Sequence, residues 1–202
     1  MVNNVIGRPL PQIFGLEKVT GRALFTFDLK LPGLLYAAVK HSEVPHARIK
    51  KIDVDKAVKL PGVMAVITGA DVPRGLHGRG LLDTPILARD IVRYVGEPVA
   101  AVAANDYETA LEAAELIDVE YDELPALFDP EESLNEKPSV IIHPLIYSYK
   151  RLTSMRYGVV LDPSRPNVSA CQRIISGDVD TAFKEADLIV EGYYSTEPVS
   201  HV

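Results

Sequence analysis

Apolar residues in the first part of the chain gather in short runs that Gly, Pro and charged residues separate. Residues 22–28 alternate in part and contain aromatic side chains, and residues 34–39 form an uninterrupted apolar run. Both patterns are typical of strands, and the Pro-Gly pair between them favours a turn, so we expect a hairpin. Residues 47–53, in which isoleucines flank two lysines, predict a half-buried strand with a local irregularity.

The next segment predicts a short helix and a further strand. Residues 55–60 are expected to be helical, and Pro61-Gly62 ends the helix because proline lacks an amide donor and glycine accepts a reversed backbone. Residues 63–68 are apolar, which favours a buried strand. Residues 72–88 form a loop longer than most compact connections, which indicates a contact surface or a mobile segment.

The clearest pattern runs from residue 91 to residue 127. Residues 91–95 and 98–103 have the character of strands, and Gly96 between them permits a tight turn with a backbone angle open mainly to glycine. Asn105 is expected to cap the following helix, with Glu108 completing the capping box. Residues 117–121 alternate as a strand, so the segment predicts a β-β-α-β unit.

The expected helix in this unit has two different faces. Spacings of three and four residues predict that an apolar stripe packs on a sheet and that the opposite acidic stripe is solvated. The apolar stripe consists of Tyr107, Ala110, Leu111 and Ala114, and the acidic stripe consists of Glu108, Glu112 and Glu115.

Regular patterns become sparse toward the end of the chain. Residues 129–169 contain several prolines and predict a long irregular connection. Residues 169–175 are expected to be a strand. Asp178 is expected to cap a helix with Val179, Ala182, Phe183 and Ala186 on one face. Residues 188–196 are apolar and rich in strand-forming residues, which predicts a last strand.

Composition and charge exclude several classes of protein. The chain has 202 residues, 47% of them hydrophobic, which suits a globular domain. A net charge of -7 leaves no general basic surface for nucleic acid, and we interpret the short basic stretch at residues 48–51 as the exposed edge of a strand. No apolar run is long enough for a membrane span or an export signal, so we expect a cytoplasmic protein.

Candidate reactive residues give no catalytic constellation. One cysteine, Cys171, excludes an internal disulfide and an iron–sulfur cluster held by this chain alone, and we expect it to be buried in a strand. His41 and His46 are five residues apart, which suits neither one helix face nor one strand face, so polar contacts are expected rather than a metal. Glu120, Asp122 and Glu123 are interpreted as a solvated edge.

A nucleotide site is not indicated either. The glycine pair at residues 78 and 80 has neither a preceding strand nor a following helix, so it does not predict a phosphate loop. We therefore assign no catalytic residue, no cofactor-binding residue and no metal ligand in this chain.

A collinear series of phrases resembles the large, molybdopterin-binding subunits of molybdenum hydroxylases. This family includes xanthine dehydrogenase, aldehyde oxidase and aerobic carbon monoxide dehydrogenase. The phrases are EKVTGRA at 17–23, PGLLYAAV at 32–39, HARI at 46–49, DVDKA at 53–57, LPGV at 60–63, TGADVP at 68–73, YVGEPVA at 94–100, VEYDELPA at 119–126 and GDVDTAF at 177–183. The end of the chain is similar to the approach to the family's first active-site phrase, with His201 at its histidine.

The resemblance implies a fold and a division into segments. The fold class is α+β, an α/β-hammerhead with a mixed β-sheet and packed helices. Residues 1–19 are an N-terminal extension, 20–127 the hammerhead domain, 128–166 an irregular Pro-rich connection, and 167–202 the start of a truncated molybdopterin-binding region. In family members the glycine-rich cofactor loops and a glutamate base lie several hundred residues further on.

The resemblance also implies a function. The chain would be the N-terminal structural module of an oxidoreductase that hydroxylates an electrophilic carbon, inactive by itself. It would bind no cofactor alone, with molybdopterin-molybdenum in the complete subunit and iron–sulfur and FAD on partner subunits or domains. Expected partners are the missing molybdopterin-binding domain and the iron–sulfur and flavin components, with self-association possible and with neither nucleic acid nor membrane. The alternative is a stand-alone interaction or assembly module without activity, and a neighbouring reading frame for the cofactor domain separates the two.

Overall fold

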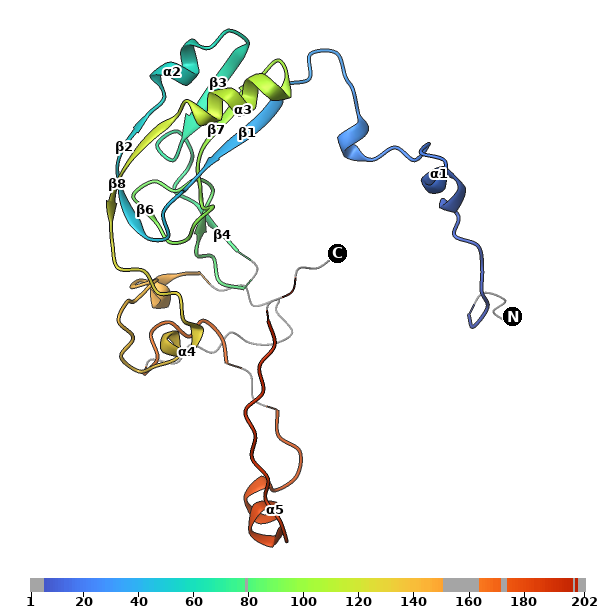
Figure 1. Ribbon diagram of the computed structural model, residues 1–202, viewed down its shortest axis with the longest axis vertical. Helices are drawn as coiled ribbons and strands as arrows, with labels where there is room; N and C mark the ends of the chain where they lie inside the picture. The colour runs from blue at the N-terminus through green and yellow to red at the C-terminus, as the bar shows by residue number, and fades with distance from the viewer. Residues whose placement is uncertain (1–5, 79, 151–163, 172–173, 198, 200–202) are drawn as a thin grey trace. The chain divides into compact units, whose positions relative to one another are not determined.

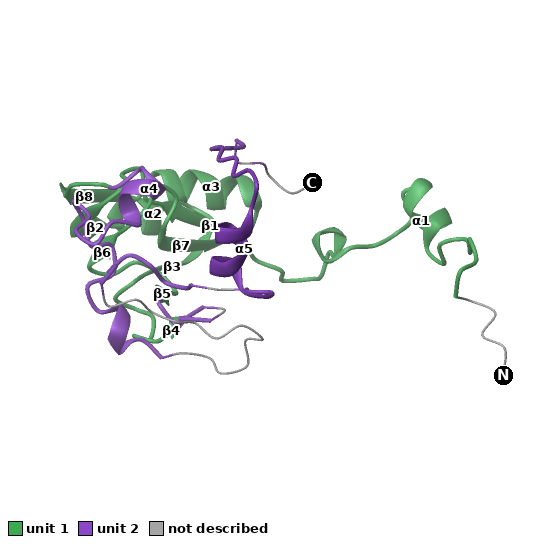
Figure 2. Cartoon of the chain, turned by 90° about the horizontal axis from the view of Figure 1, so that it is seen from below, with its two compact units in different colours: residues 1–76, 84–126 green, residues 77–83, 127–202 purple. Residues whose placement is uncertain are grey.

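Figure 1 shows the computed structural model of the chain, which describes residues 6–78, 80–150, 164–171, 174–197 and 199. The chain forms two compact units, coloured separately in Figure 2. Unit 1 comprises residues 1–76 and 84–126, and unit 2 comprises residues 77–83 and 127–202.

Unit 1 contains two small antiparallel sheets. The first has the order β1-β7-β3, and the second has the order β6-β2-β8. The strands of the first sheet are β1 (Tyr36–His41), β7 (Pro98–Ala104) and β3 (Val63–Thr68). Those of the second are β6 (Ile91–Val92), β2 (Ala47–Asp53) and β8 (Asp118–Glu123). The α+β class is thereby confirmed, but the strands of unit 1 form two small antiparallel sheets rather than the expected mixed sheet.

Helix α3 (Tyr107–Glu115) lies across the first sheet, beside the short helix α2 (Asp55–Lys59) (Figure 1). The core between helix and sheet is built mostly of alanines, which allow the helix backbone to approach the strands closely. The buried residues of this core are Ala38, Ala57, Ala100, Val102, Ala104, Ala110, Ala113, Ala114 and Ile117. A second cluster of Ala47, Ala88, Val92 and Val99 fills the space beside the second sheet.

The remaining elements are short. α1 (Gly15–Val19), which the sequence did not predict, and the 3-10 turn η1 (Thr26–Asp28) precede the first sheet. The loop expected at residues 72–88 carries the two-stranded ladder of β4 (Leu76–His77) and β5 (Thr84–Pro85). Unit 2 contains α4 (Pro130–Ser133), η2 (Ile146–Ser148) and α5 (Val179–Glu185). Among the described residues, no helix is both long and apolar enough to cross a membrane.

The predicted hairpin between residues 22–28 and 34–39 is wrong. Residues 26–28 form a 3-10 turn, and β1 pairs instead with β7, more than fifty residues further along the chain, with Val39 opposite Ala101. Residues 91–95 and 98–103, which the sequence places on either side of a tight turn, do not form a hairpin either, because β6 and β7 belong to different sheets. In both cases strand character was read from local pattern, whereas the partner of a strand is chosen by packing of distant segments.

Several predictions on local structure are confirmed. Strand β2 has a register shift between Ile49 and Lys51, at the predicted irregularity. Helix α2 ends before Gly62, whose φ of 94° is in the left-handed region that favours glycine. β3 forms as predicted but is only partly buried, because it lies at the edge of its sheet.

Helix α3 begins one residue later than expected. Asp106, not Asn105, is the cap: its carboxylate accepts the Thr109 N–H at 2.8 Å and the Thr109 hydroxyl at 2.8 Å. The apolar stripe also differs, since Tyr107 and Leu111 are exposed and the buried face consists of Ala110, Ala113 and Ala114. The alanine-rich sheet leaves room only for small side chains beneath the helix.

The predictions for the basic stretch and for the C-terminal strands also need correction. β2 is the middle strand of its sheet, so its basic residues lie on a solvated face rather than at an edge, and Lys50 pairs with Asp122 at 3.5 Å. Residues 188–196, all described, contain no strand, and neither do the described residues of 169–175. Cys171 is exposed. The helix capped by Asp178 is confirmed, with the Thr181 N–H 3.1 Å from the carboxylate.

Candidate functional site

The two sheets of unit 1 are joined where the chain passes between them twice. Residues 42–46 lead from β1 to β2, and residues 93–97 lead from β6 to β7; we name these two segments the double crossover. They run side by side, because the Gly96 N–H donates to the Ser42 carbonyl at 2.8 Å and the Ser42 N–H donates to the Glu97 carbonyl at 2.8 Å. The double crossover therefore fixes one sheet against the other.

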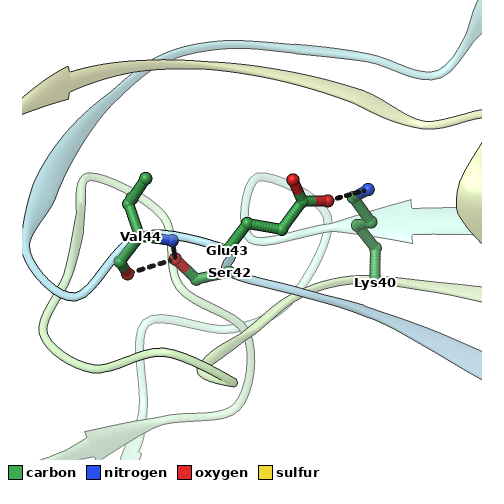
Figure 3. A network of polar contacts seen from close by, with 4 residues as sticks. All are labelled: Lys40, Ser42, Glu43 and Val44. Atoms are coloured by element: carbon green, nitrogen blue, oxygen red, sulfur yellow. Dashed lines mark hydrogen bonds and ion pairs between the residues drawn. The ribbon is translucent and has the colours of Figure 1, made fainter.

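Ser42 is almost fully buried at the centre of the double crossover. Its hydroxyl donates to the Val44 carbonyl at 2.8 Å, and its oxygen lies 3.3 Å from the Val44 N–H (Figure 3). Beside it, the Lys40 ammonium and the Glu43 carboxylate form an ion pair at 2.9 Å on the surface (Figure 3). The Ser42 hydroxyl is thus engaged in closing a turn, and neither of these two hydrogen bonds joins it to a base.

Glu97 is a buried carboxylic acid, with an exposed fraction of 2%. One carboxylate oxygen accepts the Arg93 N–H at 2.5 Å, which closes the turn before β7. Burial raises the pKa of Glu97 above its ordinary value, although this hydrogen bond and the charges of Arg93 and His46 act in the opposite direction. Burial, and secondarily the charge of Glu97, also raises the pKa of Tyr94.

The two histidines make the polar contacts that the sequence predicts. The His41 Nδ1 lies 2.7 Å from the Gly96 carbonyl oxygen, and the His46 Nδ1 lies 2.6 Å from the Pro125 carbonyl oxygen. Each imidazole therefore ties a strand end to a distant turn of the same unit.

Two glycines determine the close packing around the double crossover. Gly96 has a φ of 93°, which confirms the predicted glycine-favouring angle. Gly69, which sequence reasoning did not single out, is buried against another backbone segment: a Cβ there would lie 2.5 Å from the Ala88 carbonyl oxygen and 2.8 Å from the Arg89 Cα. The signal was hidden because a close approach of distant backbones has no local pattern.

The surface of the double crossover holds an open depression. Its volume is about 680 Å³, and it is lined by Lys40, His41, Ser42, Glu43, Val95 and Gly96. The polar side chains described above bond to backbone or to one another. The arrangement is suited to holding two sheets in a fixed relation, and it offers no nucleophile paired with a base.

The structure also describes most of the candidate metal and phosphate positions. In the part of the chain that the structure describes, no group of three or more His, Cys, Asp or Glu side chains could hold a metal ion. At Gly78 a Cβ would lie 1.9 Å from the Leu81 carbonyl oxygen, so this glycine serves a tight local turn. Residue 79, between the two glycines, and His201 lie outside the described residues.

The chain is similar to known oxidoreductase subunits over nearly its whole length. It is 36% identical over 199 residues to the nicotinate dehydrogenase large molybdopterin subunit of Eubacterium barkeri, covering 98% of this chain and 42% of that protein. It is 30% identical over 202 residues to the xanthine dehydrogenase molybdenum-binding subunit of Escherichia coli O157:H7, covering 94% of this chain and 24% of that protein. The chain thus spans less than half the length of each relative.

A solved structure shows the same fold. The Cu,Mo-CO dehydrogenase in its carbon monoxide reduced state superposes with a TM-score of 0.69 at 29% identity, covering 90% of this chain and 23% of that chain. Residues 20–125 match the family described as "Aldehyde oxidase and xanthine dehydrogenase, a/b hammerhead domain". The chain therefore belongs to the aldehyde oxidase and xanthine dehydrogenase family, whose hammerhead domain it carries at residues 20–125.

Proposed function

We propose that the chain is the N-terminal structural module of the molybdenum-binding large subunit of an aldehyde/xanthine/CO-type oxidoreductase, and that it is not catalytic alone. The observation that carries the proposal is the match of 98% of the chain to less than half of a large molybdopterin subunit. The double crossover supports it, because its buried polar groups bond to backbone and hold two sheets together.

The complete enzyme would hydroxylate an electrophilic carbon of its substrate and pass electrons to iron–sulfur and FAD partners. When bound, the molybdopterin-molybdenum group supplies the oxygen-transfer and redox chemistry. Among the described residues, no group of three or more His, Cys, Asp or Glu side chains could hold a metal ion, and Gly78 lies in a tight local turn. We therefore derive no catalytic step within this chain and assign it binding and positioning of the cofactor-bearing part.

We further propose how the chain divides into segments. Residues 1–19 extend the hammerhead domain of residues 20–127, residues 128–166 connect it, and residues 167–202 begin the molybdopterin-binding region. The Asp178-capped helix supports this last assignment, because it presents Val179 and Phe183 with exposed apolar surface that a larger domain can cover.

Expression in cells that make the molybdenum cofactor tests the proposal. The purified chain should contain no stoichiometric molybdenum and should oxidise neither aldehydes, purines nor nicotinate, because the proposal places the cofactor-binding groups in the rest of the large subunit. Metal content by mass spectrometry and turnover with an artificial electron acceptor are the measurements. Turnover of any of these substrates by the chain alone would show that it is a complete catalyst.

A further inference from the structure

The central residues of the first sheet of unit 1 are apolar on both faces. Alternate residues of β1, β7 and β3 point toward α3, as Ala38, Val102 and Val66 do. Between the strand ends, the intervening residues face the other way and are also apolar, whereas the polar residues Lys40, His41 and Thr68 lie at the ends of β1 and β3. This second set, which we name the outer face, consists of Ala37, Val39, Ala65, Ile67, Ala101 and Ala103.

The outer face is accessible in this chain. Val39 is 40% exposed and Ile67 is 41% exposed, and Ala37 and Ala65 are also exposed. An antiparallel sheet with one solvated face normally alternates apolar and polar residues, whereas strands covered on both sides are apolar throughout. The composition of the central part of these strands is therefore that of a middle layer, not of an outer one.

The second sheet of the same unit provides an internal comparison. On its solvated face Arg48 lies opposite Asp122, and Lys50 forms an ion pair with Asp122. Glu120 is likewise exposed. Since one sheet of the unit carries charges on its solvated face and the other carries none, the apolar outer face is specific to the first sheet.

We propose that the outer face is the docking surface for the cofactor-binding polypeptide of the same enzyme, through an uncharged apolar surface that packs on its alanines. The inference rests on the proposed function and adds the place of contact. In the relatives, the part matched by this chain is 42%, 24% and 23% of the whole, so most of each relative's chain is available to cover such a face.

A second copy of this chain is a poorer occupant of the outer face. Three strands about 4.8 Å apart and four to five residues at about 3.4 Å each give a face of roughly 200 Å². A dimer formed through this face alone would bury about 400 Å², well below the roughly 1,200 Å² of a stable protein–protein interface. A larger polypeptide that also contacts neighbouring segments meets this requirement.

Accessibility of the outer face in the chain alone is the first test. In a Cys171→Ser background, Ala65→Cys places a thiol on the outer face, and Glu120→Cys places one on the charged sheet as a matched control. We expect maleimide to label both thiols at comparable rates in a dilute monomer. Strong protection of the thiol at position 65 would show that a segment of this chain covers the face, which overturns the proposal.

Molybdenum retention is the second test. The native gene product is tagged in its own cells and purified as wild type, as Ala65→Arg, as Ala103→Arg and as the control Glu120→Arg. We expect both outer-face variants to retain about tenfold less molybdenum per chain, equivalent to about 1.4 kcal/mol of lost docking, and the control to match wild type. Circular dichroism of each variant shows that the unit is folded, and Ala65→Arg, at an exposed position, tests the idea if Ala103→Arg unfolds.

The outcomes separate the two proposals. If the wild-type gene product, purified from its own cells where the cofactor-binding polypeptide is also made, brings no molybdenum with it, the proposed function fails. If the wild type retains molybdenum and folded Ala65→Arg retains as much, the function stands and the docking surface is refuted. If the variants form fewer homodimers and retain molybdenum unchanged, the occupant is a second copy and the inference is wrong.

Discussion

Replacing Gly69 by alanine isolates a close contact between two backbone segments. The added Cβ would lie 2.5 Å from the Ala88 carbonyl oxygen, whereas ordinary contacts begin near 3.4 Å, so the segments must separate by nearly 1 Å. Gly69 does not have a positive φ, so the backbone conformation itself tolerates alanine. Overpacking of this kind costs about 1–3 kcal/mol.

The expected result is a lower melting temperature of unit 1. For a chain of this size each kcal/mol shifts Tm by about 2–4 °C, so Gly69→Ala should lower Tm by roughly 2–12 °C in calorimetry or circular dichroism. Loss of backbone freedom in the unfolded chain acts in the opposite direction by about 0.4–1 kcal/mol, and the steric cost exceeds it.

Gly75 supplies a matched control in the same unit. A Cβ at Gly75 meets nothing within 4 Å and its φ is not positive, so Gly75→Ala should leave Tm unchanged or raise it slightly. A lower Tm for Gly69→Ala together with an unchanged or higher Tm for Gly75→Ala would identify the contact with Ala88. If Gly69→Ala and Gly75→Ala shift Tm equally, the close approach of the two segments does not exist in solution.

Four further predictions concern the turn, the buried acid, the helix cap and the C-terminal segment. Gly96→Val should destabilise the fold by more than about 1 kcal/mol because its φ is 93°, and an unchanged melting midpoint would contradict this. Glu97→Gln keeps an oxygen that accepts the Arg93 N–H, and it removes the carboxyl group, whose pKa is raised by burial. The protonated Glu97 carboxyl stabilises the fold below the pKa that it has in the unfolded chain, and this contribution is lost as pH rises through its pKa in the folded chain. Glu97→Gln should therefore be more stable than wild type near pH 7 and equally stable near about pH 4. Parallel profiles of Tm against pH for the two proteins would refute this. Asp106→Ala should cost about 0.5–2 kcal/mol through the lost cap, whereas Asn105→Ala should cost less; a larger loss at position 105 in urea titrations would restore the sequence-based cap. Amides of residues 188–197 should exchange rapidly in the chain alone and slow down when the cofactor-binding polypeptide is present, and strong protection in a dilute monomer would show that this segment is satisfied within the chain.

The local sequence pattern was sufficient to predict most helices and strands of unit 1 and two special backbone positions. The apolar runs at 34–39, 63–68 and 98–103 became β1, β3 and β7 with small shifts in their ends. Gly96 and the irregularity in β2 were also predictable, because a turn or a bulge is determined by residues adjacent in sequence. The collinear phrases led to the family, which the match over residues 20–125 supports.

Tertiary structure decided which strands pair and which faces are covered. β1 joins β7 rather than a neighbouring segment, and β6 and β7 separate into two sheets, because pairing depends on which distant apolar faces pack together. The same packing placed Gly69 against the backbone at Ala88, a contact with no local signature. The sequence of a strand shows that both its faces are apolar, but it does not show what covers each face. Only the tertiary structure shows that α3 covers one face of the first sheet and that the outer face is exposed in this chain.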